Sequence, residues 1–165
     1  DTIWGLGCDA TNQDAVKKLY SIKQRDDRKA MLVLIDSIDY LEYYVEDVPE
    51  IAADLIEVSE KPLTIIYSGA KNMASNLIAP DGTIGIRITR ENFSNSLCKC
   101  LRRPVVATSA NISNAPSPAS FSEIQKEIID SVDYVVNYRQ EENTKNKASS
   151  IIKLNKNGVV TIIRP

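Results

Sequence analysis

Lys23 and Arg25, two residues apart, are the clearest sign of anion chemistry in this sequence. A lysine supplies a compact point charge and an arginine supplies directional donors, and a triphosphate needs both. If the chain is extended at this point, the two side chains leave on the same side. The alternative is a solvated helix end, where basic residues are favoured by the helix dipole.

Hydroxyl and amide side chains follow directly after a predicted buried strand at residues 105–107. Ligands of open α/β sheets bind at the C-terminal ends of strands. Ser109 and Asn111 alternate, which predicts that both point into the same crevice, and Ser117 follows in a loop stiffened by two prolines. A hydrogen-bonded turn that caps a helix is the alternative interpretation.

Arg87 lies inside an apolar run of strand length, residues 84–88. A charged group among isoleucines is normally avoided unless it faces a ligand or an ion-pair partner. A guanidinium group in such a place could clamp a carboxylate with two parallel hydrogen bonds. Arg164, at the end of the last predicted strand, is a weaker candidate of the same kind. A sheet face exposed to water would also explain both residues.

Several classes of chemistry are excluded by what the sequence lacks. Histidine is absent, so no Ser-His-Asp triad, Cys-His pair or His-ligated metal site can form. Cys8, Cys98 and Cys100 are too few for a disulfide framework or a Cys₄ metal site, and we interpret them as free thiols of a cytoplasmic protein. No Walker-type loop is present, and Gly5-Leu6-Gly7 alone fits either a close backbone approach to a ligand or a neighbouring element, or a tight strand-to-helix turn.

The composition indicates one globular domain. A length of 165 residues suits a single domain, and 43% hydrophobic with 25% charged residues is close to the globular average. The net charge of −2 gives no overall attraction to nucleic acid. No apolar run approaches the roughly 20 residues of a membrane-spanning helix, so we expect no membrane association.

Short apolar runs alternate with amphipathic stretches along the chain. Helices are expected over residues 12–23, 40–58 with a break at Pro49, 93–101, and 120–130, where Ser120 and Glu123 form a capping-box pattern. Strands are expected at residues 31–35, 63–67, 83–88, 105–107, 132–136, 150–154 and 159–163, with a polar loop over 139–149. This mixture predicts an α/β fold in which helices cover one twisted, mixed sheet.

Taken in order, these segments resemble the YrdC-like L-threonylcarbamoyladenylate synthase family. Residues 2–7 are similar to the core of the family's opening signature, Lys23-Gln24-Arg25 to its K-x-R element and Ser109-Ala110-Asn111 to its S-x-N element. Three further matches fall between and after these in the family's order: Lys61-Pro62-Leu63-Thr64, Gly85-Ile86-Arg87 and Pro116-Ser117-Pro118.

The resemblance implies one YrdC-like domain over residues 1–165, with a twisted mixed sheet and a concave cavity, in the family's short, single-domain form. The family's Pro-Thr ahead of Asp1 is not present, and we expect an N-terminal strand to be missing there. Asp26 replaces the proline that usually follows K-x-R, and residues 137–139 replace the usual Asp-Gly-Gly.

The activity implied by the resemblance is nucleotidyl transfer. L-threonine, bicarbonate or CO₂, and ATP are condensed into L-threonylcarbamoyladenylate with release of pyrophosphate, for N6-threonylcarbamoyladenosine (t6A) at tRNA position 37. Mg²⁺ is expected to ride on the triphosphate, without a dedicated protein metal site. The implied partners are downstream threonylcarbamoyl-transfer proteins, with tRNA or double-stranded RNA as a further candidate.

The resemblance also assigns residues. Lys23 and Arg25 are the catalytic pair and hold the ATP phosphates, while Arg87 clamps the threonine carboxylate. The other implied ATP-binding residues are Thr83, Ser109, Asn111, Ser117 and Arg164. The other implied threonine-binding residues are Thr2, Ala107 and Ser149.

Two alternatives stay open at this point. One is a non-catalytic RNA-binding module of the same fold, in which the same basic side chains contact phosphates. Against it, basic residues are not in excess and aromatic residues make up only 6% of the chain, which is poor for base stacking. The other is a paralogue with an altered substrate, against which the intact K-x-R and S-x-N elements argue.

Overall fold

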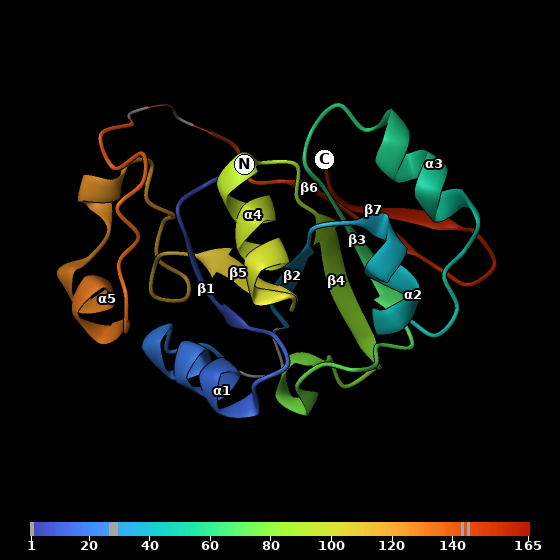
Figure 1. Cartoon of the computed structure of the whole chain (residues 1–165), viewed down its shortest axis with the longest axis horizontal. Helices are drawn as coiled ribbons and strands as arrows, with labels where there is room; N and C mark the ends of the chain where they lie inside the picture. The colour runs from blue at the N-terminus through green and yellow to red at the C-terminus, as the bar shows by residue number, and fades with distance from the viewer. Residues whose placement is uncertain (1, 27–29, 143, 145) are drawn as a thin grey trace.

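Seven strands form one mixed sheet in the computed structural model, which describes residues 2–26, 30–142, 144 and 146–165 (Figure 1). The strands are β1 (Gly5–Asp9), β2 (Leu32–Ile35), β3 (Leu63–Ser68), β4 (Thr83–Ile88), β5 (Val105–Ser109), β6 (Ser150–Leu154) and β7 (Val160–Arg164). Their order is β1-β5-β2-β4-β3-β6-β7, with β2/β4 and β3/β6 parallel and the other pairs antiparallel. The predicted α/β fold with one mixed sheet is therefore confirmed.

Five α-helices and three short 3₁₀ turns connect the strands in the described part of the chain. The helices are α1 (Gln13–Ile22), α2 (Leu41–Tyr44), α3 (Ile51–Val58), α4 (Asn92–Leu101) and α5 (Lys126–Ser131), and the 3₁₀ turns are η1 (Ile38–Tyr40), η2 (Ser75–Leu77) and η3 (Phe121–Glu123). Helix α1 begins as predicted, because the Asn12 side chain accepts hydrogen bonds from the backbone N–H groups of Asp14 and Ala15, each at 3.0 Å. None of these helices is long and apolar enough to cross a membrane.

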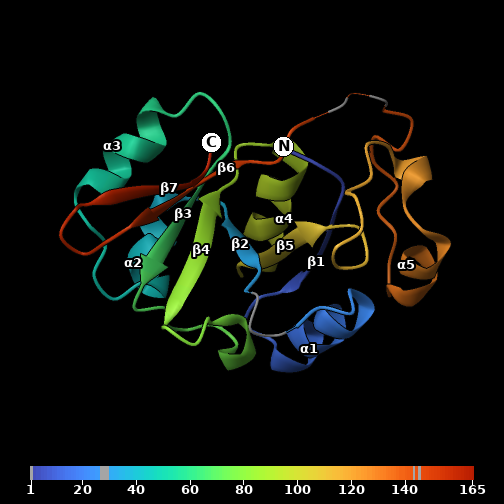
Figure 2. The ribbon, with the colours of Figure 1, turned by 180° about the vertical axis from the view of Figure 1, so that it is seen from behind.

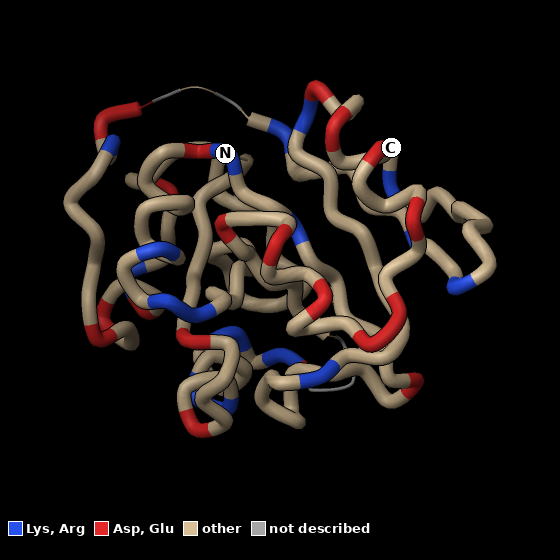
Figure 3. Tube along the Cα trace, turned by 45° about the vertical axis from the view of Figure 1, so that its right-hand side comes forward, with Lys and Arg blue, Asp and Glu red and all other residues tan. Residues whose placement is uncertain are grey.

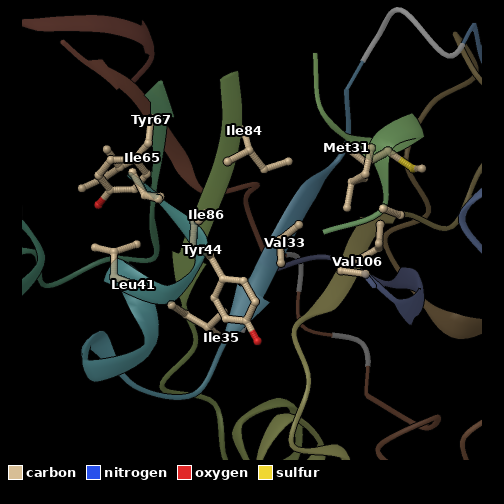
Figure 4. Close-up of a cluster of buried hydrophobic side chains, with 14 of the residues drawn as sticks. Met31, Val33, Ile35, Leu41, Tyr44, Ile65, Tyr67, Ile84, Ile86 and Val106 are labelled. Carbon is tan, nitrogen blue, oxygen red and sulfur yellow. The ribbon is translucent and has the colours of Figure 1, made fainter. Parts of the chain in front are cut away.

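The two faces of the sheet bury different sets of side chains, because successive strand residues alternate in direction. On β2, Val33 and Ile35 join the large cluster beside Leu41 and Tyr44 of α2 (Figure 4). Between them, Leu34 packs on the opposite face with Cys98 of α4 in a second, smaller cluster. The large cluster therefore stabilises one face, while the opposite face is left for α4 and the functional site.

The two glycines of Gly5-Leu6-Gly7 lie within a strand, so the alternative of a strand-to-helix turn is wrong, and the alternative of a close approach to a neighbouring element is confirmed. Gly7 pairs with Ala107 of β5, and a Cβ atom added to Gly7 would lie 2.7 Å from the Val106 carbonyl oxygen. A Cβ atom on Gly5 would lie 3.0 Å from the Thr108 carbonyl oxygen. The glycines are therefore needed because β1 and β5 approach too closely for side chains.

The segment between residues 120 and 136 also differs from the prediction. The expected helix is divided into η3 and α5, and the Ser120 side chain makes no cap hydrogen bond; instead the Glu123 carboxylate accepts from the Ala119 N–H at 2.9 Å. The expected strand at residues 132–136 does not form, and these residues line a cavity instead. The apolar alternation there does not mark a buried strand: Tyr134 is 76% exposed and Val136 37% exposed, and the segment pairs with no strand of the sheet. The predicted polar loop at 139–149 contains no strand in its described residues, and residues 143 and 145 lie outside the description.

A β-bulge interrupts the pairing of β6 with β7. Ile152 is opposite Ile162, but the residue before it in β6, Ile151, is opposite Arg164. Ile163 is therefore an extra residue in β7. Residues opposite each other in a ladder point to the same face. The bulge therefore turns Arg164 to the face of Ile151, whereas unbroken alternation would turn it to the core face of Ile152.

Candidate functional site

A cavity of about 1220 Å³ lies on the sheet face that carries α4. Nine of the predicted site residues line it: Thr2, Arg25, Thr83, Arg87, Ala107, Ser109, Ser117, Ser149 and Arg164. They come from segments far apart in the chain, which the views from the front and from behind (Figure 2) place around the central strands. The remaining two, Lys23 and Asn111, do not belong to the lining.

One row of side chains crosses the cavity face from strand to strand. The register places Leu34 (β2) opposite Arg87 (β4), Thr64 (β3) opposite Ile151 (β6), and Ile151 opposite Arg164 (β7). Thr64 follows on from the pair Ile65–Ile86 and so lies beside Arg87. All of these residues line the cavity. The row therefore presents two arginines separated by one hydroxyl and one aliphatic side chain.

Arg87 is 5% exposed, so its charged group is buried, as its place in an apolar run suggested. Burial, and then the positive charge of Arg164, lower the pKa of Arg87 to about 10, so the guanidinium is still protonated at neutral pH. Two guanidinium groups that repel each other across a cavity favour an anion between them. A carboxylate or phosphate group is the ligand whose oxygens match such donors.

Buried hydroxyl groups lie beside the two arginines and contact Arg164. The Oγ1 of Thr64 and the Oγ of Ser149 lie 2.9 Å apart, and both residues are at most 3% exposed. Arg164 donates from Nε to the Ser149 carbonyl oxygen at 2.8 Å and from Nη2 to the Ser149 Oγ at 3.4 Å. From the sequence, Thr64 is assigned no role. The feature that could have identified it is its place at the end of Lys61-Pro62-Leu63-Thr64, where it brings a hydroxyl group into an otherwise apolar strand.

Arg25 and Ser109 line the cavity at the end of α1 and β5. The chain is not extended there: Gln24 has φ of 49°, and the Arg25 N–H donates to the Tyr20 carbonyl oxygen at 3.0 Å, which closes the helix with a left-handed residue. The two side chains of Lys23 and Arg25 therefore do not leave on the same side as the extended geometry would require. Arg25 Nη2 donates to the Ala30 carbonyl oxygen at 3.0 Å.

Lys23 is 1% exposed, and its ammonium group donates to the backbone carbonyl oxygens of Ser109 and Asn111, the latter at 2.8 Å. Burial, and then the charge of Arg25, lower the pKa of Lys23 to about 8. The Asn111 amide does not point into the cavity with Ser109; its Nδ2 donates to the carbonyl oxygens of Ile112 at 2.9 Å and Ala115 at 2.6 Å. Simple alternation failed here because the chain leaves the strand at Ser109.

Three other predicted residues lie along the lining. Thr83, at the start of β4, is 8% exposed, and its Oγ1 donates to Asp81 Oδ1 at 2.6 Å. Ser117 is exposed beside the buried Pro118, and Thr2 is half-buried ahead of β1. Thr83 lies on the same face of β4 as Arg87, whereas Thr2 and Ser117 line the cavity from outside the central strands.

Aromatic pairs, which the sequence reasoning missed, form part of the cavity wall. Trp4 and Phe121 make an edge-on contact with ring centroids 5.5 Å apart, and Phe93 stacks on Tyr138 at 5.1 Å. Such faces suit a planar base or an apolar group. They come from four separate segments, so no local motif announces them.

Charged side chains of both signs are spread along the whole trace (Figure 3). The positive character of the site is thus local, supplied by the buried Arg87 together with the more exposed Arg25 and Arg164. Within the described ranges, no group of three or more His, Cys, Asp or Glu side chains is placed to hold a metal ion.

Comparisons with known proteins agree with this geometry. The family model for Sua5, YciO and YrdC, described as "Telomere recombination", matches residues 1–165. A threonylcarbamoyl-AMP synthase of Pseudoalteromonas translucida is 32% identical over 139 residues, covering 82% of this chain and 74% of its own length. A second, of Idiomarina loihiensis, is 32% identical over 140 residues, covering 82% of this chain and 75% of its own.

Solved structures show the same fold. The crystal structure of P. abyssi Sua5 complexed with L-threonine superposes with a TM-score of 0.86 at 24% identity and covers 99% of this chain. The match spans 48% of that protein, so this chain corresponds to about half of its length. Since the family model covers the chain from end to end and two relatives exceed 30% identity, the resemblance inferred from the motifs is confirmed, and the chain belongs to the Sua5/YciO/YrdC family.

Proposed function

We propose that the chain is an L-threonylcarbamoyladenylate synthase, which joins L-threonine, bicarbonate or CO₂, and ATP and releases pyrophosphate. The observation that carries the proposal is the row of Arg87, Thr64, Ile151 and Arg164 across the cavity floor. Two relatives of the chain at 32% identity are named threonylcarbamoyl-AMP synthases. The product would serve t6A formation at tRNA position 37.

The row matches the functional groups of threonine. Arg87 would bind the carboxylate with two hydrogen bonds, while the Thr64 and Ser149 hydroxyl groups would bind the substrate hydroxyl. The aliphatic side chains of Leu34 and Ile151 on the same row would contact the methyl group. Thr2 and Ala107, which also line the cavity, would complete the threonine site.

ATP would occupy the rest of the cavity. Arg25 would bind the phosphates, with Thr83, Ser109, Ser117 and Arg164 as further contacts on the lining. The cavity volume of about 1220 Å³ is sufficient for a nucleotide and an amino acid together. Mg²⁺ would be carried by the triphosphate.

The reaction needs positioned charges and no protein nucleophile. The threonine amine adds to CO₂ and loses a proton to form a carbamate, whose oxygen attacks the α-phosphorus while pyrophosphate leaves. The two reactants gain most from being held side by side, and the guanidinium groups stabilise the charge on the phosphates. Downstream transfer proteins and tRNA would then receive the threonylcarbamoyl group.

Pyrophosphate release from ATP tests this function. We expect release only when both threonine and bicarbonate are present, because the carbamate must form before the α-phosphorus is attacked. Reactions lacking one component serve as controls. If no combination releases pyrophosphate while the protein retains tRNA or duplex RNA, the proposal is wrong and a binding module of the same fold takes its place.

Thr64→Val removes one hydroxyl group while keeping the shape of the side chain. We expect KM for threonine to rise about tenfold, since a buried hydrogen-bonding group near the substrate is worth about 1.4 kcal/mol. Serine and threonine should be affected alike, because both carry the hydroxyl group. Thr161→Val, on the exposed strand β7, is the matched control. An unchanged KM for threonine would place the substrate hydroxyl elsewhere.

A further inference from the structure

We propose that residues 132–142 form a strap that gates one side of the cavity, and that Tyr138 and Arg139 latch this strap to the start of α4. The strap follows α5 and runs along one end of the molecule (Figures 1 and 2). The contacts of the latch are independent of the proposed function. The identity of the ligand that passes the gate, ATP, rests on it.

The strap is a thin wall between the cavity and the solvent. Most of its residues line the cavity, among them Tyr134, Val136 and Tyr138. Tyr134 is 76% exposed and Tyr138 is 42% exposed, so both also face water. In the described part of the chain the strap pairs with no strand of the sheet, so no ladder of backbone hydrogen bonds holds it. A segment with so few buried contacts opens more easily than the core of the protein.

Two helices hold the strap, one near each end. Near its start, Lys18 of α1 donates to Asp133 at 2.6 Å, in an ion pair between two exposed side chains. Near its end, the Tyr138 ring stacks on Phe93 of α4, with the ring centroids 5.1 Å apart and an angle of 22° between the planes. An exposed ion pair contributes little, so the stack is the stronger of the two attachments.

Arg139 completes the latch from the side of the strap. Its Nη1 lies 3.8 Å from Glu91 Oε1, and its guanidinium carbon lies 5.9 Å from the centroid of the Tyr138 ring. Glu91 caps α4, since its carboxylate accepts from the Phe93 N–H at 3.1 Å and the Ser94 N–H at 2.7 Å. The latch therefore joins the strap to the first turn of α4.

The turn at the end of the strap is braced internally. Arg139 donates from Nε and Nη2 to the two carboxylate oxygens of Glu142, at 2.6 and 2.7 Å. The Glu142 N–H donates to the Arg139 carbonyl oxygen at 2.9 Å, and Gln140 Nε2 donates to the Val136 carbonyl oxygen at 2.8 Å. Release of the latch leaves these contacts intact, so the turn moves as one unit.

A gate leaves a kinetic signature that a binding contact does not. If ATP crosses the strap side only while the latch is open, the association and dissociation rate constants both scale with the open fraction, and their ratio Kd stays unchanged. A side chain that contacts the nucleotide changes the dissociation rate constant and Kd together. The two roles of Tyr138 are therefore distinguishable by experiment.

Stopped-flow binding of mant-ATP, a fluorescent form of ATP, to the full chain tests the proposal. Trp4, the single tryptophan of the sequence, lines the cavity and would transfer its excitation energy to the bound nucleotide. Tyr138→Leu keeps an apolar side chain but removes the stack. We expect association and dissociation each to become about fivefold faster, with Kd changed by less than about twofold. Phe93→Leu should give the same result, and the double variant should be no faster, because the stack is already lost.

Tyr43→Leu is the matched control. Tyr43 is also an exposed tyrosine in contact with another ring, that of Tyr44 at 5.0 Å between centroids, but it lies outside the cavity lining. We expect both rate constants to stay unchanged in this variant. Unchanged rate constants in Tyr138→Leu would overturn the gate. Faster dissociation with unchanged association would also overturn it, because Tyr138 would then bind the nucleotide itself.

Glu91→Gln is a second variant that leaves both rings in place. The amide keeps a side-chain oxygen to cap α4 but lacks the charge that attracts Arg139. We expect association and dissociation of mant-ATP each to become about twofold faster, since an ion pair of this length contributes little. A change in only one of the two rate constants would overturn the part of Arg139 in the latch.

The same measurements separate the gate from the proposed function. If the unaltered protein does not bind mant-ATP, the strap gates no nucleotide and the proposal falls. If it binds mant-ATP with the expected response to Tyr138→Leu but releases no pyrophosphate, the gate stands and only the proposed function fails.

Discussion

Replacing Arg87 with methionine is expected to reduce kcat/KM for threonine by roughly a hundredfold or more. Loss of a buried charged partner costs about 3 kcal/mol or more, and 1.4 kcal/mol corresponds to a factor of ten. The loss should appear as a raised KM for threonine with a smaller change in KM for ATP, since Arg87 would bind the carboxylate. Initial rates of pyrophosphate release at varied threonine concentration measure it.

The controls for Arg87→Met address folding and charge. Methionine fills the buried space, so the melting temperature should stay within about 5 °C of the unaltered protein. Arg90→Met removes an exposed guanidinium whose donors reach the carbonyl oxygens of Ile56 and Ser59, outside the cavity, and should leave KM for threonine unchanged. A normal KM for threonine in Arg87→Met would refute the carboxylate assignment.

Gly7→Ala is expected to cause the largest loss of stability, about 3 kcal/mol. The new Cβ atom would lie 2.7 Å from the Val106 carbonyl oxygen and 3.2 Å from Val105 Cγ1, so backbone of β1 or β5 must move. For a chain of this size the loss lowers the melting temperature by roughly 10 °C. Thermal or urea unfolding measures it.

Gly85→Ala provides the matched comparison for Gly7→Ala. Its Cβ atom would meet Thr64 Cγ2 at 3.4 Å, an ordinary contact, so we expect a change in the free energy of unfolding of less than about 1 kcal/mol. Equal losses in the two variants would mean that the close approach of β1 to β5 is not what requires Gly7.

The sequence predicts the central elements of the fold well, because their signals are local. The apolar runs at β2, β3 and β4 and the Asn12 cap of α1 are each contained in a few residues. The segment at residues 132–136 carried the same kind of pattern and is no strand, since a strand needs a partner and this segment pairs with none of the strands of the sheet. Pairing is a property of the whole chain, which a local pattern does not contain.

The identity of the residues around the site was easier to predict from the sequence than the way in which they are arranged. The family motifs led to residues that gather around one cavity, and Arg87 was anomalous enough to find from burial arguments alone. The inward direction of Lys23 follows the buried face of α1, one turn beyond Leu19 and Tyr20. The position of Arg25 depends on the left-handed Gln24, which an ordinary amino acid at that position does not announce. Thr64 likewise gains its importance from the strand order, which places it beside Arg87.

The extra residue Ile163 also bears on how molecules of this protein behave at high concentration. β7 is the last strand in the sheet order and exposes Val160, Ile162 and Ile163, which makes it a surface onto which a strand of another molecule could add. A bulge bends the strand and breaks the regular spacing of its outward N–H and C=O groups. The irregularity that orients Arg164 therefore also limits edge-to-edge aggregation.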